Sequence, residues 1–144
     1  MGERRAEGRK SGMSTEKDFL ASVEEFRAKV PSMQPVEHQT FCCAELREQY
    51  RGVEWPEWTG RAGVYYILNE SDCVVYVGAG TAWYGVVHRV EVRIKQKNLP
   101  KTTRAGAVLL KEPDWYWAWS LEAFLIDSLN PKLNDRLRRK AKSE

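Results

Sequence analysis

Two apolar runs decide the fold of this 144-residue chain: Gly63-Val64-Tyr65-Tyr66-Ile67-Leu68 and Val74-Val75-Tyr76-Val77-Gly78. Both are rich in β-branched and aromatic residues, which favour buried strands. The residues between them include Asn69-Glu70-Ser71-Asp72, which has the composition of a turn. Together these features predict a β-hairpin built from two largely buried strands.

Further helical and strand patterns lie on both sides of this hairpin. Phe19, Val23 and Phe26 recur at helical spacing before it, and an apolar run follows it at 105–110. In chain order we expect helices over 14–30 and 43–51, the two hairpin strands, a helix over 82–97, a strand over 105–110, and a helix over 114–129 that Asp114 caps. This order predicts an α+β fold with a small mixed or antiparallel three-stranded sheet flanked by helices.

The length of the chain predicts one globular domain with extensions. Residues 1–13 and 135–144 are basic and polar, and we expect two basic tails, the first of them disordered. Residues 14–60 have too few apolar positions for a core of their own. We therefore expect them to form a helical N-terminal extension packed on the domain at 61–134.

The composition indicates a soluble, cytoplasmic protein without a membrane partner. Apolar residues make up 42% of the chain and charged residues 30%. No run has the length of a membrane span or the pattern of a signal peptide. The three cysteines, Cys42, Cys43 and Cys73, are odd in number and lack the spacing of a zinc site, which argues against a disulfide framework and against structural zinc.

The net charge of +3 is unevenly distributed along the chain. A central basic cluster follows the hairpin, and its members are Arg89, Arg93, Lys95, Lys97, Lys101 and Arg104. Blocks of like charge are often solvated surface. A cluster beside a candidate site nevertheless favours a polyanionic partner such as DNA.

Four elements, in this order, resemble the GIY-YIG nuclease superfamily. The hairpin carries Gly63-Val64-Tyr65 and Tyr76-Val77-Gly78, where the family has Gly-Ile-Tyr and Tyr-Ile-Gly. The next predicted helix carries Val86-Val87-His88-Arg89-Val90, which is similar to the family's Leu-x-x-Arg-Leu. The glutamate helix of the family is matched by Leu121-Glu122-Ala123-Phe124-Leu125-Ile126, and its later asparagine by Asn130-Pro131-Lys132-Leu133-Asn134. The resemblance covers residues 63–134, so residues 61–134 are expected to form a GIY-YIG-like nuclease domain.

This resemblance implies a divalent-metal-dependent DNA endonuclease that hydrolyses phosphodiester bonds. It implies that Tyr65 is the general base, that Tyr76 positions the phosphate or the water, and that Glu122 holds Mg²⁺ or Mn²⁺. The other implied residues are Arg89 and Asn134 in the catalytic site, with Arg93 and Lys132 as contacts to nucleic acid.

The chemistry of the residues supports part of this assignment and leaves alternatives open. Glu122 lies in an otherwise apolar helix pattern, and a buried carboxylate needs either a metal or a cationic partner such as Arg89. An arginine presents a planar fork of donors that matches phosphate oxygens. Each tyrosine is equally compatible with a core position and a satisfied hydroxyl, and Asn134 with the cap of a turn.

Two departures from the family pattern bear on the site. Arg93 also fits the arginine position, and Ala79 stands where some members of the family carry a lysine. The alternative function is therefore a catalytically weakened DNA-binding module of the same fold. A third possibility, suggested by the tryptophans near Trp55 and Trp115, is a protein-interaction domain. DNA specificity would come from the N-terminal segment, from a homodimer or from a targeting partner.

Overall fold

The computed structural model describes residues 14–81, 85–100 and 103–134, and within them the chain forms four α-helices and a four-stranded antiparallel sheet. The helices are α2 (Glu16–Lys29), α3 (Cys43–Gln49), α4 (Gly85–Gln96) and α5 (Ala118–Leu129). The strands are β1 (Glu37–Cys42), β2 (Gly63–Leu68), β3 (Val74–Gly80) and β4 (Arg104–Leu109). The predicted α+β class is confirmed. The predicted tails at 1–13 and 135–144 lie outside the described residues.

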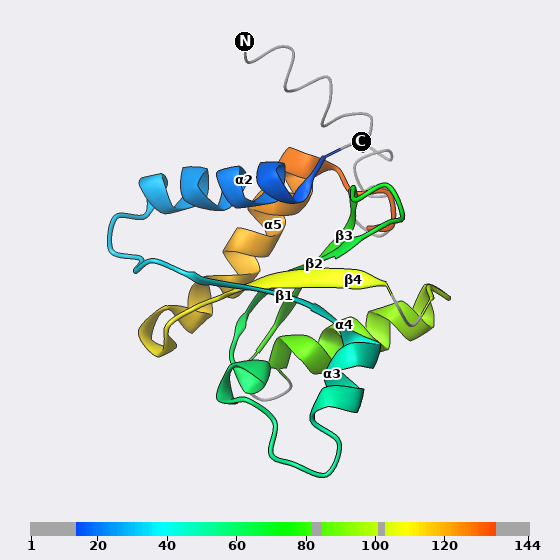
Figure 1. The fold of residues 1–144 in the computed structure, drawn as a ribbon. Coiled ribbons are helices and arrows are strands. Elements are labelled where there is room, and N and C mark those ends of the chain that lie inside the picture. Colours follow the sequence, from blue (N-terminus) through cyan, green and yellow to red (C-terminus); the bar gives the residue numbers. More distant parts are fainter. Residues whose placement is uncertain (1–13, 82–84, 101–102, 135–144) are drawn as a thin grey trace.

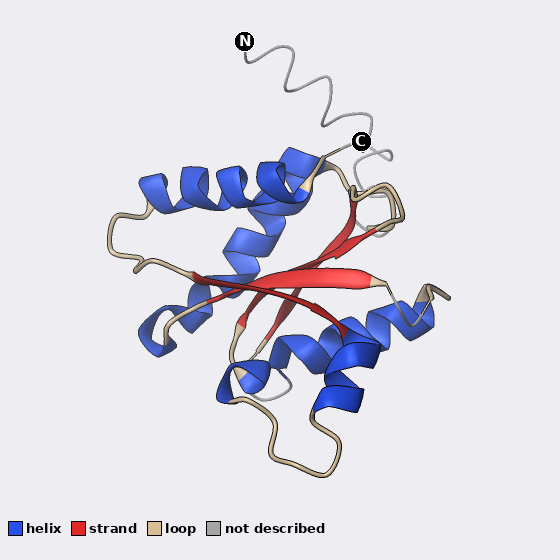
Figure 2. Cartoon of the chain, in the orientation of Figure 1, coloured by secondary structure: helices blue, strands red, loops and turns tan. Residues whose placement is uncertain are grey.

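The sheet separates two pairs of helices. Helices α2 and α5 cover one face, and α3 and α4 cover the other (Figures 1 and 2). None of the helices in the described residues is long and apolar enough to cross a membrane.

The strand order is β1-β4-β2-β3, so the prediction of three strands was wrong. The strand that the sequence analysis missed is β1, which pairs antiparallel with β4 from Glu37 opposite Leu109 to Cys42 opposite Arg104. β1 forms one edge of the sheet, and its first four residues are exposed or half-buried. An exposed edge strand needs no apolar alternation, and the polar sequence of β1 therefore resembled a loop.

Strand β2 is the centre of the molecule. All six of its residues are buried, and it pairs with β3 on one side and β4 on the other. Val64 and Tyr66 face the core beneath α2 and α5, whereas Tyr65 and Ile67 face the core beneath α3 and α4. The predicted hairpin is therefore confirmed, and it contributes side chains to both cores.

The first and last helices begin differently. Thr15 caps α2 by accepting a hydrogen bond from the Asp18 amide at 3.3 Å, and the Asp18 carboxylate accepts one from the Thr15 amide at 2.9 Å. Asp114 was predicted to cap the last helix, which was wrong, because it lies in a 3₁₀ turn at Glu112–Trp117 and α5 begins at Ala118. Its buried carboxylate instead accepts a hydrogen bond from the Gln34 amide at 2.8 Å, which ties the chain after α2 to the start of α5.

Two neighbouring tyrosines of β2 lie across glycines of the adjacent strands. A Cβ atom added at Gly78 would clash with the ring and hydroxyl of Tyr65, and one added at Gly106 would clash with those of Tyr66. Each ring thus fills the space that a side chain on the neighbouring strand would occupy.

We expect Gly106→Ala to lower the free energy of unfolding by about 1–3 kcal/mol, because the fully buried ring of Tyr66 has no space to withdraw into. Urea unfolding followed by circular dichroism measures this. Gly60→Ala is the matched control, since a Cβ there meets no atom within 4 Å, and it should change stability by less than about 0.5 kcal/mol. Equal effects of the two substitutions would contradict the packing argument.

Candidate active site

A pocket of about 350 Å³ lies at the β3 edge of the sheet, between α4 and α5. All five residues predicted to be catalytic line it. They are Tyr65 from β2, Tyr76 from β3, Arg89 from α4, Glu122 from α5 and Asn134 from the segment after α5. Arg93 lines it as well, whereas the exposed Lys132 is not among the lining residues. The fold therefore brings together residues that are widely separated in the sequence.

A β-bulge in the hairpin puts both tyrosines on the same face of the sheet. Ile67 lies opposite Tyr76, but the next residue of β2 lies opposite Val74, so Val75 is an extra residue. Val74 faces α2 and α5, and strict alternation would direct Tyr76 to that side too. The extra residue reverses the alternation, and Tyr76 joins Tyr65 in the core beside α4.

The two pocket tyrosines form a packed pair with raised pKa values. Their ring centroids are 6.1 Å apart and their planes are inclined by 27°. Burial raises the pKa of both phenols, and the guanidinium of Arg93 offsets only part of this rise. At neutral pH both phenols therefore carry a proton and can donate hydrogen bonds. This state opposes the general-base role that the family resemblance implies for Tyr65.

Helix α4 and the residue that follows it supply a row of three cations to the pocket. Arg89 and Arg93 lie in α4, and Lys97 comes directly after its last residue. The Lys97 amide still donates to the Arg93 carbonyl at 2.9 Å, so the three side chains share one face at intervals of about 6 Å along the axis. The guanidinium carbon of Arg93 lies 5.5 Å from the centre of the Tyr76 ring, and the Lys97 Nζ lies 5.9 Å from it. Both arginines line the pocket, and Arg93 is the one that lies over the tyrosine pair.

Arg93 also has an unused donor. Its terminal nitrogen donates to the Gln96 side chain at 2.5 Å, whereas its Nε is buried and has no hydrogen-bond partner in the described part of the chain. A buried donor without a partner costs on the order of 1–3 kcal/mol. The guanidinium also hydrogen-bonds to the Tyr65 side chain, which favours the charged arginine.

Among the described residues that line this pocket, Glu122 is the single one with a carboxylate side chain. It is half-buried, and it contributes to the raised pKa of Tyr76. Within the described residues no group of three His, Cys, Asp or Glu side chains could hold a metal ion. A cation at Glu122 would therefore take its other ligands from water and from the substrate, which suits Mg²⁺ because it retains much of its hydration.

Asn134 binds backbone on the edge strand. Its Oδ1 accepts a hydrogen bond from the Val77 amide at 2.9 Å, and its Nδ2 donates to the Val77 carbonyl at 2.8 Å. The Leu133 amide donates to the Val75 carbonyl at 2.8 Å. These bonds satisfy polar groups of β3 that face away from β2. Asn134 thus holds the segment after α5 against β3 and closes one side of the pocket.

Among the lining residues that the predicted site lacked, one is cationic and one is aromatic. Lys97 belongs to the central basic cluster and lies one helical turn beyond Arg93, so helical spacing carried the signal. Trp119 lies three residues before Glu122, on the same face of α5, and its side chain is 54% exposed. The sequence contained no signal for Trp119, because the exposure that distinguishes this side chain is known only from the structure.

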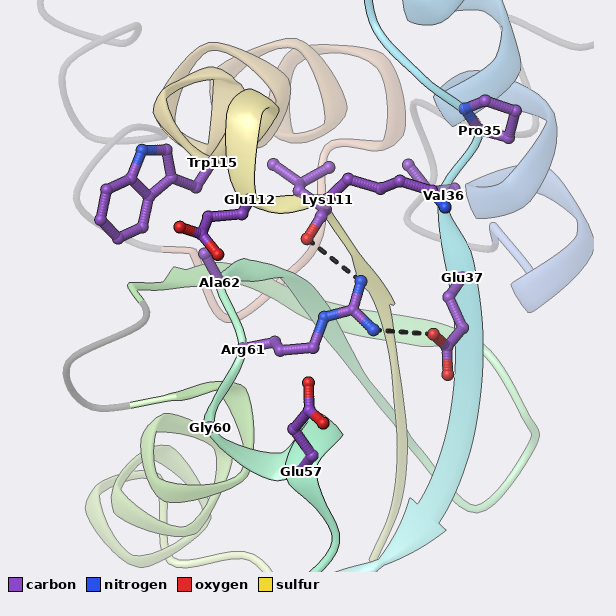
Figure 3. Close-up of a pocket in the computed structure, with 11 residues that line it drawn as sticks. Pro35, Val36, Glu37, Glu57, Gly60, Arg61, Ala62, Lys111, Glu112 and Trp115 are labelled. Atoms are coloured by element: carbon purple, nitrogen blue, oxygen red, sulfur yellow. Dashed lines mark hydrogen bonds and ion pairs between the residues drawn. The ribbon is translucent and has the colours of Figure 1, made fainter.

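A larger pocket, of about 680 Å³, has the opposite electrostatic character (Figure 3). Arg61 donates there to the Glu37 carboxylate at 2.8 Å and to the Leu110 carbonyl at 3.2 Å. Glu57 points toward Arg61, and Glu112 also lines this pocket (Figure 3). The larger pocket sets three carboxylates against Arg61 and Lys111, whereas the pocket at the β3 edge sets three cations against one carboxylate. The smaller pocket is therefore the better candidate for binding phosphate.

The raised phenol pKa values predict a loss of stability at high pH. Unfolded tyrosines ionise near pH 10, whereas the folded state keeps Tyr65, Tyr66 and Tyr76 protonated. The free energy of unfolding should therefore be intact below pH 10 and should fall above it, by up to about 1.4 kcal/mol per pH unit for each such phenol.

Urea unfolding at several pH values between 8 and 11 measures this slope. Tyr65→Phe should flatten it, and Tyr116→Phe, which changes an exposed side chain, should leave it as in the wild type. A slope that is identical in all three proteins would contradict the assignment.

Removal of the Asn134 amide should destabilise the edge strand. We expect Asn134→Ala to lower the free energy of unfolding by about 1–3 kcal/mol, because it leaves the buried Val77 amide and carbonyl without partners. Urea unfolding tests this, with the exposed Lys132→Ala as a control that should stay within about 0.5 kcal/mol of wild type. An effect of Asn134→Ala no larger than that of the control would show that these bonds are dispensable.

Comparison with protein-family models, with curated proteins and with solved structures finds no match to this chain. The family resemblance therefore stays a prediction, and functional arguments rest on the pocket itself.

Proposed function

We propose that this chain is a metal-dependent DNA endonuclease that hydrolyses phosphodiester bonds in the pocket at the β3 edge. One observation carries the proposal. Residues expected in the site from four separate sequence elements, from Tyr65 to Asn134, line a single pocket together with a row of cations. Such a convergence supports a common chemical task, because packing alone does not require these residue types to meet.

The cationic row suits a phosphodiester. Hydrolysis builds negative charge on the phosphate oxygens, and fixed cations near those oxygens lower the barrier. Arg89 and Arg93 line the pocket and offer planar sets of donors to phosphate oxygens. Tyr65 and Tyr76, both protonated at neutral pH, would donate hydrogen bonds to the phosphate or orient the attacking water.

The metal would bind at Glu122. One half-buried carboxylate in a pocket with three cations gives weak affinity for a free divalent ion, so binding is expected to require the phosphate as a further ligand. When bound, Mg²⁺ or Mn²⁺ would polarise the phosphate and lower the pKa of a bound water. The chain's own part is to hold the ion through Glu122 and to place the phosphate against α4.

Removal of the Glu122 charge should abolish cleavage. We expect Glu122→Gln to reduce Mg²⁺-dependent nicking of a plasmid by about 100-fold or more. The matched control is Asp127→Asn, because Asp127 is an exposed carboxylate of the same helix outside the pocket, and it should cleave as wild type does. If wild type and Glu122→Gln gave the same background nicking, the nuclease proposal would be lost.

The two neighbouring tyrosines of β2 provide a second test. Tyr65→Phe should slow cleavage by on the order of 100-fold, because it removes a hydrogen-bond donor inside the pocket. Tyr66→Phe removes an equally buried hydroxyl that contacts Glu16 and His38 on the other face of the sheet, and it should leave cleavage unchanged. Equal losses in the two variants would mean that the Tyr65 hydroxyl acts only through stability.

A DNA-binding module without turnover is the second candidate. The observations that favour it are the protonated state of both phenols, which supply no ready base at neutral pH, and the presence of a single carboxylate, which would have to serve both the metal and the proton transfer. Salt-sensitive DNA binding without metal-dependent cleavage would support this candidate, and a lack of DNA binding at low salt would exclude both.

A further inference from the structure

Exposed aromatic side chains gather at the start of α5. Among the described residues the large hydrophobic side chains that are exposed are Val53, Trp55, Trp115, Tyr116 and Trp119. Three of these five fall within residues 115–119, with side chains that are 49%, 62% and 54% exposed. Isolated exposed apolar residues are common, but a group of large aromatic rings is typical of a binding surface.

Trp119 connects this aromatic group to the candidate active site. It lines the same pocket as Glu122, and the spacing of three residues puts both side chains on one face of α5. The indole therefore presents apolar surface to the solvent at the place where the carboxylate is exposed. Trp115, one turn earlier, lies at the rim of the larger pocket (Figure 3).

The opposite wall of the pocket is cationic. Arg89 and Arg93 line it from α4, and Lys97 lines it from the position directly after that helix. A positively charged groove that follows the phosphates, combined with an aromatic ring on which a base can stack, is the usual arrangement in proteins that bind single-stranded nucleic acid.

The size of the pocket points the same way. A volume of about 350 Å³ is that of a small-molecule site, so the pocket can admit one nucleotide. A base inside a continuous duplex is stacked on both faces and cannot meet an indole. The aromatic wall is therefore useful only for a base that is unpaired.

We propose that the pocket takes a single-stranded segment of DNA, in which one base stacks on the indole of Trp119 and the adjoining phosphates contact the cationic row of α4. The choice of DNA rests on the proposed function, and the preference for an unpaired base rests on Trp119 and on the pocket volume. Preferred substrates are then single strands, gaps and branches, and a continuous duplex is a poor one.

Fluorescence anisotropy in EDTA tests this preference without cleavage. The probes are a fluorescein-labelled single strand of about 20 nucleotides, the corresponding duplex, and the same duplex with a gap of about five nucleotides. We expect the full-length protein to bind the single strand and the gapped duplex at least about tenfold more tightly than the continuous duplex. Trp119→Ala should weaken binding of these two probes by roughly 5- to 150-fold and leave duplex binding within about twofold.

Two further variants sharpen the result. Trp119→Phe, which keeps an aromatic ring, should retain most of the preference. Trp55→Ala removes an exposed tryptophan that does not line the pocket, and it should bind all three probes as wild type does. The basic residues near both ends of the sequence are present in every variant, so they cannot account for a difference between them.

Equal affinity of the wild type for all three probes would overturn the proposal, as would a Trp119→Ala variant that binds them as wild type does. Trp119-dependent binding of an acidic peptide or of anionic vesicles in place of DNA would overturn it too. Because this readout requires no turnover, it is independent of the Glu122→Gln cleavage test, and either proposal can fail while the other holds.

Discussion

The packing of two tyrosine rings against two glycines is the constraint on which the rest of the structure depends. Tyr65 and Tyr66 leave the central strand on opposite faces, and each ring lies flat across a glycine of a neighbouring strand, Gly78 or Gly106. This arrangement lets a fully buried strand carry an aromatic ring on each face, with helices packed closely above and below it. The sheet, both helix layers and the floor of the pocket all follow from it.

The same packing explains part of the hairpin motif without any reference to function. Gly78 is needed because Tyr65 occupies its space, and Gly63 is needed because a Cβ there would clash with the Val108 carbonyl. The two glycines of the hairpin motif thus have a packing reason of their own. Residues that packing does not explain, such as Arg93, Glu122 and the exposed Trp119, are therefore the better indicators of function.

The sequence predicted what periodicity and motif spacing encode. The hairpin and the elements around it gave clear patterns, and the five proposed catalytic residues do line one pocket. Strand β1 was missed because an edge strand with polar side chains has the composition of a loop. Contacts between residues that are far apart in the chain could not be predicted from these patterns. Asp114 accepts a hydrogen bond from the Gln34 amide instead of capping its helix, and Asn134 binds the backbone of Val77.

The row of cations beside the pocket has an energetic cost in the folded chain. Like charges four residues apart on a helix repel each other by a few tenths of a kcal/mol; Arg89 and Arg93 form one such pair in α4, and Lys97 follows Arg93 at the same spacing, directly after the helix. The buried Nε of Arg93, which has no partner within the described residues, adds a larger cost. Cations placed elsewhere on α4, as Lys95 is, would keep the helix soluble without these costs. Under the proposed function, a phosphate between the three side chains would offset the repulsion among them.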